Sequence, residues 1–281
     1  MRTLATRLGA VAYQGEAGAY SDEAAQTVRP GARTIGHQTF AGTIKALLDR
    51  KVDAAVLPVE NSLAGIVQEV NDLLWDNRLL TVVGEYVHPV RHCLLGHGEP
   101  VKRAISHPQA LAQCRRWLAD NNIEAVPFMD TAGAARQVAE SQARGTGAIA
   151  SKSAAKRYGL QIIAEGIQDD PSNRTRFLVV ERGIPTRPEA AAGSTKASLA
   201  FIAAHQPGSL VGALQAFSTR GVNLTRLDSR PLRDRPFEYL FYVDFEVGDP
   251  ESAGEALADL ESQAREVRFF GTYPSAATAA G

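Results

Sequence analysis

The sequence predicts an α/β fold in two parts. The first part is a two-lobed domain of parallel sheets flanked by helices, and the second is a smaller ferredoxin-like βαββαβ module. From about residue 10 to residue 183, short apolar runs alternate with amphipathic stretches at helical spacing. After Gly183–Lys196, a linker rich in Pro, Ala and Gly, the elements follow in the order strand, helix, strand, strand, helix, strand.

Length and composition are those of an ordinary globular protein. The 281 residues, 44% hydrophobic and 22% charged, have room for two domains with a substantial core. A formal net charge of -1 gives no electrostatic basis for binding nucleic acid or an anionic membrane. No apolar run approaches a membrane span, and the first residues lack the apolar segment of a signal peptide. Cys93 and Cys114 lie outside any CxxC motif and indicate reduced thiols, so we expect a cytoplasmic protein.

The first lobe should alternate strands and helices. Ser21 is expected to cap a helix, because Asp22 and Glu23 in the following turn complement the helix dipole. Apolar residues at helical spacing predict further helices over 40–48 and 66–74. The strands expected in this lobe are Ala10–Tyr13, Asp53–Val59 and Leu79–Val83.

An extended segment, Glu85–Gly96, should carry the chain into the second lobe, where strands again lead into helix starts. Pro108 suits the first position of a helix, and Asp130 and Ser151 are expected caps. The chain then returns to the first lobe through Asp169–Val180, in which the turn DDPSN leads into the apolar strand FLVV. The other strands expected in this lobe are Ala104–Ser106, Val126–Met129, Ala148–Ala150 and Gln161–Ile167.

The C-terminal module has a different spacing of elements. A Pro-Gly turn at His205–Ser209 precedes a helix that Gly221 should end. A polar turn, Arg233–Pro236, should join two strands, and the chain after Pro274 is expected to fray. The expected elements are strand Ser198–Ala203, helix Leu210–Arg220, strands Asn223–Leu232 and Phe237–Glu246, helix Ser252–Gln263 and strand Glu266–Tyr273.

Polar residues follow the strands of both lobes, at the sheet edge where ligands bind in parallel α/β folds. Helix N-termini at this edge offer free N–H groups and the positive end of a dipole, which suit an anion. Two lobes facing each other would form a cleft for a small acid, although each residue alone could be an ordinary cap. These residues are Ser21, Ser62, Ser106, Asp130 and Ser151.

Three loops combine the groups that such a cleft needs: Glu60-Asn61-Ser62, Ser106-His107-Pro108-Gln109 and Asn173-Arg174-Thr175-Arg176. Together they can hold a polyanion and donate a hydrogen bond to a departing oxygen. Separately, each is also typical of turns, caps and a surface arginine. His88 and His92 are four residues apart, but their strand-like context argues against a helical metal site, and no metal is expected.

Five motifs in this order, YQGEAGAYS, VLPVENSLAG, HCLLG, SHPQAL and NRTRF, resemble the prephenate dehydratase family. The C-terminal module resembles the regulatory ACT domain attached to that enzyme, through GALQAF at Gly212–Phe217 and DSRP at Asp228–Pro231. The family usually has Glu where this chain has Asp228. Since no segment like chorismate mutase precedes the motifs, the resemblance indicates a monofunctional enzyme.

The resemblance implies a two-lobed catalytic domain, similar in architecture to periplasmic binding proteins, that converts prephenate to phenylpyruvate with loss of CO2 and of the ring hydroxyl. No cofactor is implied, and no Rossmann or P-loop motif is present. Phenylalanine is the implied regulator, and a homodimer or dimer of dimers, formed through the ACT and catalytic domains, is the implied assembly. The expected boundaries are 8–183 for the catalytic domain (lobe I 8–86 and 174–183, lobe II 87–173), 184–196 for the linker and 197–275 for the ACT domain.

The resemblance also assigns roles to individual residues. Thr175 carries the essential hydroxyl, Glu60 is an alternative proton source if it is desolvated, and Arg176 is expected to grip the pyruvyl carboxylate. Asn61 and Gln109 complete the catalytic set, and Ser21, Ser62, Ser106 and Phe177 the substrate-binding set. The phenylalanine site is expected at Leu210, Gly212, Ala213, Leu214, Asn223, Asp228, Ser229 and Arg230.

Three alternatives stay open at this point. An arogenate dehydratase would perform the same chemistry on an aminated side chain. A solute-binding protein would use the same anion-binding cleft without catalysis. The ACT-like module could be a dimerisation sheet without a ligand.

Overall fold

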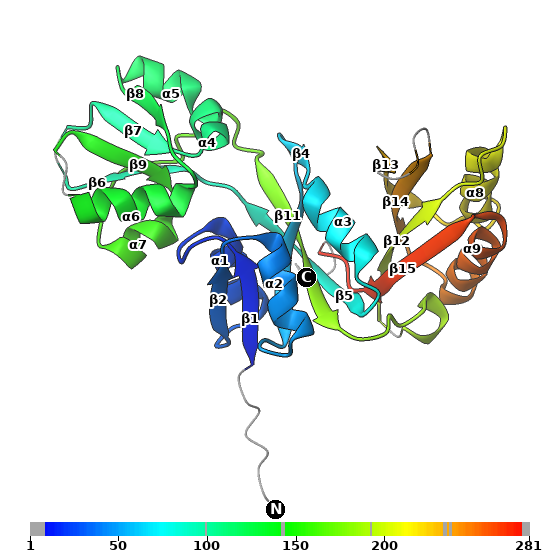
Figure 1. Cartoon of the computed structure of the whole chain (residues 1–281). Helices are drawn as coiled ribbons and strands as arrows, with labels where there is room; N and C mark the ends of the chain where they lie inside the picture. The colour runs from blue at the N-terminus through cyan, green and yellow to red at the C-terminus, as the bar shows by residue number, and fades with distance from the viewer. Residues whose placement is uncertain are drawn as a thin grey trace, which may run out of the picture. The chain divides into compact units, whose positions relative to one another are not determined.

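The computed structural model describes residues 9–98, 100–141, 144–191, 193–232, 235 and 238–276. These residues form three sheets with helices packed on them (Figure 1), which confirms the predicted α/β class. The chain divides into two compact units: the first is Met1–Val67 with Val87–Phe177, and the second is Gln68–Tyr86 with Leu178–Gly281. We describe each unit separately.

The first sheet has the strand order β2-β1-β3-β11-β5, with β4 paired to β3. Strand β1 pairs in parallel with both β2 and β3, as expected for strands joined by helices. The first six residues of β3 are buried, as in parallel strands that helices cover on both faces. The elements are β1 (Ala10–Gln14), α1 (Tyr20–Val28), β2 (Arg33–His37), α2 (Phe40–Leu48), β3 (Ala54–Asn61), β4 (Gly65–Ile66), β5 (Leu80–Pro89) and β11 (Arg174–Arg182).

The second sheet, in the first unit, has the order β10-β6-β9-β7-β8. It is mixed, so the prediction of a parallel sheet is wrong for β6, which pairs antiparallel with β9 and β10. The reason is that residues 97–102, between β6 and β7, are too few for the crossover helix that parallel strands require, so β6 runs opposite to β7 and to β9, which pairs in parallel with β7. The elements are β6 (Cys93–Gly96), β7 (Arg103–Ser106), α4 (Pro108–Gln113), α5 (Arg115–Asp120), β8 (Glu124–Pro127), α6 (Thr131–Ser141), β9 (Thr146–Ala150), α7 (Lys152–Tyr158) and β10 (Gln161–Glu165).

Two of the five predicted caps are confirmed. Asp130 Oδ1 accepts from the N–H of Gly133 at 2.7 Å, and Ser151 Oγ accepts from the N–H of Ala154 at 3.1 Å. The other three predictions are wrong. Helix α1 begins after Ala19, so Ser21 lies in its first turn; His107 caps α4 in place of Ser106; and Ser62 is followed by β4, not by a helix.

The second unit contains the predicted βαββαβ module, and its order is confirmed. The sheet order is β13-β14-β12-β15, with α8 and α9 burying apolar side chains such as Phe201, Phe217 and Phe245. Of the predicted turn Arg233–Pro236, all but Arg235 lies outside the described residues, as does Phe237. The elements are η1 (Pro188–Ala190) in the predicted linker, then β12 (Lys196–Ile202), α8 (Ser209–Ser218), β13 (Leu224–Pro231), β14 (Tyr239–Glu246), α9 (Pro250–Gln263) and β15 (Glu266–Tyr273).

Segment 68–86, which contains α3 (Gln68–Asp76) and most of β5, also belongs to the second unit and contacts the module's sheet. Arg268 of β15 donates from Nε to the carbonyl of Leu74 at 2.8 Å and from Nη2 to the carbonyl of Asn77. Thr81 Oγ1 donates to the carbonyl of Phe270 at 3.2 Å. The sheet is therefore bonded to a segment that lies more than a hundred residues earlier in the chain.

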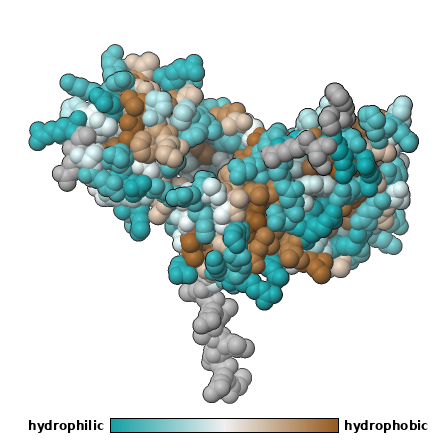
Figure 2. All heavy atoms as spheres, viewed as in Figure 1, coloured by the Kyte–Doolittle hydropathy of each residue, from teal (hydrophilic) through white to brown (hydrophobic). Residues whose placement is uncertain are grey.

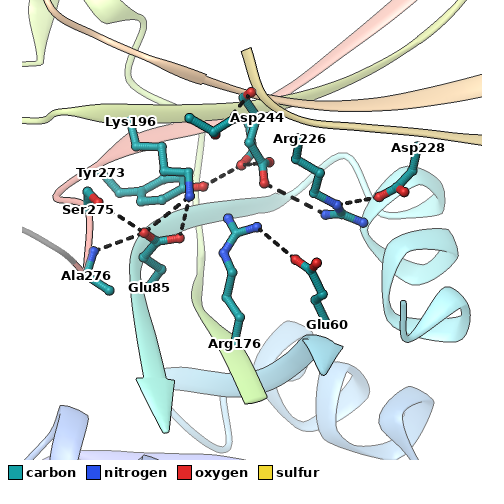
Figure 3. Close-up of polar contacts among 12 residues, drawn as sticks. Glu60, Glu85, Arg176, Lys196, Arg226, Asp228, Asp244, Tyr273, Ser275 and Ala276 are labelled. Atoms are coloured by element: carbon teal, nitrogen blue, oxygen red, sulfur yellow. Dashed lines mark hydrogen bonds and ion pairs between the residues drawn. The ribbon is translucent and has the colours of Figure 1, made fainter. Parts of the chain in front are cut away.

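A buried ion pair strengthens this contact. Lys196 Nζ lies 3.1 Å from Glu85 Oε2, and their side chains are 14% and 3% exposed. The same carboxylate accepts hydrogen bonds from the Ser275 hydroxyl and from the N–H of Ala276 (Figure 3). At least three donors thus surround the Glu85 carboxylate, and partners of this kind are the condition for a stable buried charge.

The face of the molecule drawn in Figure 2 is mostly hydrophilic, with smaller separate apolar patches. Among the described helices, none is both long and apolar enough to span a bilayer.

Candidate active site

The first unit contains a cavity of about 270 Å³ at the ends of strands from both of its sheets. Four predicted site residues line it together: Ser21, Asn61, Gln109 and Thr175. Five others are not among the residues that line it: Glu60, Ser62, Ser106, Arg176 and Phe177.

Three helices begin at this cavity. Its lining includes Tyr20 and Ser21 from the first turn of α1, Gln109 from α4, and Thr131 at the start of α6. The free N–H groups and dipoles of helix N-termini favour an anionic ligand. None of the described lining residues is Lys or Arg, and one of them, Asp130, is acidic, so it is these helix starts that favour an anion there.

Asn61 sets the direction of the hydrogen bonds in the cavity. Its Oδ1 accepts from the backbone N–H groups of Leu63 and Ala64, at 3.1 and 2.9 Å. A backbone N–H can only donate, so the oxygen of the Asn61 amide must face these groups and Nδ2 must face the opposite side. From there Nδ2 donates to Asn173 Oδ1 at 2.9 Å and to Thr175 Oγ1 at 3.0 Å.

The Thr175 hydroxyl is therefore a donor. Its oxygen accepts from Asn61, and its own hydrogen has no acceptor among the residues that the structure describes. Since Thr175 lines the cavity, this hydrogen is available to a bound ligand.

The hydrogen bonds continue from Asn173 to a residue that sequence reasoning missed. Asn173 is fully buried, and its Nδ2 donates to Gln113 Oε1 at 3.0 Å. His92 Nε2 lies 2.8 Å from the same oxygen. The Gln113 amide nitrogen has no partner among the described residues, and Gln113 lines the cavity, so its N–H groups are a second donor to a ligand. One signal was available: Gln113 follows Gln109 by four residues on one face of α4.

Tyr20 ends this series, which we call the hydrogen-bond chain. Its hydroxyl lies 2.8 Å from His92 Nδ1 and 3.0 Å from the carbonyl oxygen of Arg91. Burial lowers the pKa of His92, although the bond to Gln113 opposes this, and burial raises the pKa of Tyr20 well above its usual value. Both side chains are therefore uncharged at neutral pH. The residues of the hydrogen-bond chain, in order, are Thr175, Asn61, Asn173, Gln113, His92 and Tyr20.

The structure places Glu60 and Arg176 in contact with each other (Figure 3). Arg176 Nη1 lies 3.9 Å from Glu60 Oε2, and the Glu60 side chain is 43% exposed. The Glu60 carboxylate is therefore partly open to solvent, and Glu60 is not among the residues that line the cavity. Arg176 follows Thr175 directly on β11, and successive side chains of a strand point to opposite faces.

The remaining three predicted residues have structural partners. Ser106 is fully buried and donates to the carbonyl of Ile149 at 2.6 Å. Ser62 Oγ accepts from the N–H of Arg174 at 3.0 Å, which holds β11 next to the loop after β3. Phe177 is 1% exposed and belongs to the core.

The residues predicted to bind phenylalanine lie on several surfaces of the second unit. Leu210 lines a cavity of about 310 Å³ with His205 and Tyr239. Asn223 contacts Glu246, Asp228 accepts from Arg226 at 2.5 Å (Figure 3), and Arg230 pairs with Asp72. Of the others, Ala213 is buried in the core, Gly212 and Leu214 are half-buried, and Ser229 is exposed.

No group of three or more His, Cys, Asp and Glu side chains among the described residues could hold a metal ion. His88 Nε2 instead lies 3.0 Å from Glu23 Oε2.

Known proteins resemble this chain over nearly its whole length. Arogenate dehydratase/prephenate dehydratase 2, chloroplastic, of Arabidopsis thaliana is 44% identical and covers 94% of this chain, which spans 72% of that protein. The structure of prephenate dehydratase from Arthrobacter aurescens in complex with L-Phe is 29% identical in sequence and aligns with a TM-score of 0.86. The alignment covers 96% of this chain and 91% of the Arthrobacter aurescens chain. GqqA, described as a novel type of quorum quenching acylase, is 38% identical in sequence and also aligns with a TM-score of 0.86. The alignment covers 95% of this chain and 98% of the GqqA chain.

The family model of prephenate dehydratase matches residues 11–184, which include the whole hydrogen-bond chain. The chain therefore belongs to the prephenate dehydratase family.

Proposed function

We propose that this protein is a hydro-lyase that converts prephenate to phenylpyruvate, CO2 and water in phenylalanine biosynthesis, without a cofactor. One observation carries the proposal: the hydrogen-bond chain leaves the Thr175 hydroxyl and the Gln113 amide as two uncharged donors in one cavity. Membership of the family supports the same reaction.

The reaction needs donors of this kind. As the bond between the ring and its carboxylate breaks, CO2 leaves, and the electron pair moves into the ring and expels the hydroxide, which takes a proton from solvent to become water. Aromatisation drives the step, but hydroxide is a poor leaving group. Preorganised donors aimed at the departing oxygen stabilise its developing charge, typically by a factor of about 100 to 1000 for each donor. We assign this role to Thr175 and Gln113, with Asn61 as the residue that orients Thr175.

The carboxylates of the substrate would lie against the helix N-termini. Ser21, Gln109 and Thr131 belong to these first turns and line the cavity. A site without a formal cation beside the leaving carboxylate avoids stabilising the ground state, which would slow decarboxylation. The Glu60–Arg176 pair would then shape the edge of the site without forming part of the donor set.

The domain boundaries expected from the sequence are part of the proposal: catalytic domain 8–183, linker 184–196 and ACT domain 197–275. L-Phenylalanine would bind the ACT domain and inhibit the enzyme by favouring a less active arrangement. The Arthrobacter aurescens relative in complex with L-Phe supports this regulation, as does the cavity at the start of α8. We also propose a homo-oligomer, at least a dimer, in the cytoplasm; the two free cysteines support that compartment.

The experiment is incubation of the purified protein with prephenate and, separately, with arogenate. Phenylpyruvate is the expected product from prephenate, and phenylalanine would be the product from arogenate. Added L-phenylalanine should lower the rate. The Arabidopsis thaliana relative carries both names, so preference for arogenate is the alternative that this assay decides.

A matched pair of variants tests the mechanism. Thr175→Val removes the hydroxyl at nearly constant volume and should lower kcat by roughly 100- to 1000-fold. Thr175→Ser keeps the hydroxyl and should keep most of the turnover. Near-normal turnover in Thr175→Val would exclude the hydroxyl as the donor, whereas no reaction of the unmodified protein with either substrate would refute the function.

Hydrolysis of an acyl amide is a second candidate, because GqqA is described as an acylase and is 38% identical. A serine- or threonine-based acylase needs a nucleophile beside a base. Here Thr175 Oγ1 accepts from an amide, and the hydroxyl bonded to an imidazole is the phenol of Tyr20. We therefore place this activity second. Release of free acid from N-acyl substrates, lost in Thr175→Val, would reverse the order.

A further inference from the structure

The outer end of the hydrogen-bond chain consists of His92 and Tyr20, which the proposed reaction does not use directly. We propose that these two are positioning residues: the Tyr20 phenol holds His92 in its Nε2–H tautomer, and His92 in turn keeps the Gln113 amide nitrogen turned into the cavity. This inference rests on the proposed function only for its kinetic readout, since the tautomer can be measured without substrate.

The tautomer follows from the direction of the bonds. The N–H groups of Leu63 and Ala64 determine that Asn61 donates to Asn173, so Asn173 Oδ1 is an acceptor and Asn173 Nδ2 is a donor. The Gln113 atom that accepts the hydrogen bond from Asn173 Nδ2 must then be its oxygen. His92 Nε2, 2.8 Å from that oxygen, is compatible with it only as an N–H donor.

The other ring nitrogen must then accept. His92 is 2% exposed, and its burial favours the neutral ring, in which only one nitrogen carries hydrogen. Nδ1 therefore carries no hydrogen and offers a lone pair to the Tyr20 hydroxyl, which lies 2.8 Å away. The phenol has one hydrogen and two acceptors within reach, because the carbonyl of Arg91 is 3.0 Å away. Donation to His92 is the arrangement that satisfies the buried nitrogen.

Loss of the phenol hydroxyl removes the constraint at Nδ1 and leaves the bond from Asn173 to Gln113 as the remaining one, so the preference for the Nε2–H form weakens. With no donor at Nδ1, the His92 ring can carry its hydrogen on Nδ1, and Nε2 becomes an acceptor. Gln113 can satisfy that acceptor only by turning its amide over, which also breaks its bond to Asn173. The inverted amide presents an oxygen to the cavity, where negative charge develops on the departing hydroxide. A donor is then replaced by a repulsive group.

The test is Tyr20→Phe, which removes only the hydroxyl, with Tyr158→Phe as the matched control. Tyr158 lies in the same unit and donates to the carbonyl of Ala17 at 2.8 Å, outside the hydrogen-bond chain. Nitrogen NMR of protein labelled with 15N-histidine reports the His92 tautomer directly. We expect the Nε2–H form in the unmodified protein and in Tyr158→Phe, and a mixture of both tautomers in Tyr20→Phe.

Kinetics give the second readout. In Tyr20→Phe, kcat for prephenate should fall on the order of 10-fold, less than for complete loss of a donor, with little change in KM. Tyr158→Phe should retain its kcat. A His92 ring in the Nδ1–H form in the unmodified protein would overturn the proposal without any variant. An unchanged tautomer in Tyr20→Phe, or an unchanged kcat despite a changed tautomer, would also overturn it. If the protein does not act on prephenate, the NMR result still decides the structural part.

Discussion

Two backbone N–H groups, those of Leu63 and Ala64, determine the chemistry of side chains on other elements. They hold the Asn61 oxygen, and the Asn61 nitrogen then makes Thr175 an acceptor from within the protein and a donor toward a ligand. A backbone amide cannot reverse its polarity, whereas hydroxyls, carboxamides and imidazoles can. A network anchored in this way is preorganised, so it needs no rearrangement when charge develops in the substrate.

Asn61→Asp tests this anchor. The carboxylate would place an acceptor opposite three acceptors that now bind Nδ2: Asn173 Oδ1, the carbonyl of Arg174 and Thr175 Oγ1. We expect kcat to fall by roughly 100- to 1000-fold, because the Thr175 hydroxyl would turn to donate to the new carboxylate. Steady-state kinetics measure the effect.

Asn121→Asp is the control, since Asn121 Nδ2 donates to the carbonyl of Trp117 at an exposed helix end, at 2.8 Å. It should keep its normal kcat. Equal rates for the two variants would contradict the role of Asn61.

The buried His92 should make stability depend on pH. Burial lowers its pKa from the usual 6.5, so between these two values the unfolded chain binds a proton that the folded protein does not. The free energy of unfolding therefore rises with pH through this range, and stability is lost as the pH falls below 6.5. Urea unfolding at a series of pH values measures this slope.

In His92→Asn, which cannot ionise, the slope between pH 6.5 and the lowered pKa should be smaller than in the unmodified protein. Parallel curves for the two proteins would show that His92 does not titrate in this way.

At the scale of elements, the contact between α3, β5 and the module's sheet is polar and buried. Burial lowers the pKa of Arg268 to about 10, with a further effect of the nearby Arg78, so its guanidinium is still charged at neutral pH. It donates to the carbonyls of Leu74 and Asn77, at the C-terminal end of α3. A cation at this end of a helix complements the dipole and satisfies carbonyls that have no partner within the helix.

Lys196→Met tests the buried ion pair at this contact. It removes the Lys196 ammonium from the Glu85 carboxylate, whose side chain is 3% exposed, so we expect a loss of about 3 to 5 kcal/mol in the free energy of unfolding. Adding Glu85→Gln removes the buried negative charge and keeps an acceptor for the N–H of Ala276, so the double variant should regain much of the stability. Chemical denaturation measures both variants.

Lys45→Met is the matched control. Lys45 pairs with Asp49 on the surface, with a side chain that is 74% exposed, and its loss should cost less than about 1 kcal/mol. A loss in Lys196→Met as small as in this control would mean that the Glu85 site remains hydrated.

At the scale of the whole molecule, neither compact unit is one continuous stretch of the sequence. The family model covers residues 11–184, yet residues 68–86 within that range belong to the same unit as the C-terminal module. These residues contact β13, β15 and the start of β12 through Asp72, Glu85 and two carbonyls at the C-terminal end of α3. The module should therefore depend on them for stability.

A fragment of residues 194–281 should show this dependence. Without segment 68–86, the sheet loses the partners of Lys196, Arg230 and Arg268, and the buried side chains Tyr242 and Phe270 become more exposed. We expect the fragment to bind a hydrophobic dye such as ANS more strongly than the full chain, and to lose amide-exchange protection in β12 and β15. Protection equal to that in the full chain would mean that the module folds independently.

Much of the local structure could be predicted from the sequence. The order of the last six elements, the bounds of β15, and the caps Asp130 and Ser151 all follow from apolar periodicity and cap chemistry over a few residues. Strand β2, in which Ile35 is the only large apolar residue, carries too weak a pattern and was missed. Four predicted site residues, Ser21, Asn61, Gln109 and Thr175, do line one cavity.

The sequence by itself determined the α/β class, the module order and the loops that carry Asn61 and Thr175. Only the tertiary structure decided that Ser106 and Phe177 turn into the core, that segment 68–86 joins the C-terminal module, and that Gln113, His92 and Tyr20 belong to the site. The physical reason is range. Secondary structure depends on neighbours a few residues apart, whereas the bonds from Asn61 to Asn173 and from Tyr20 to His92 join residues 112 and 72 positions apart, whose meeting depends on how the strands pack.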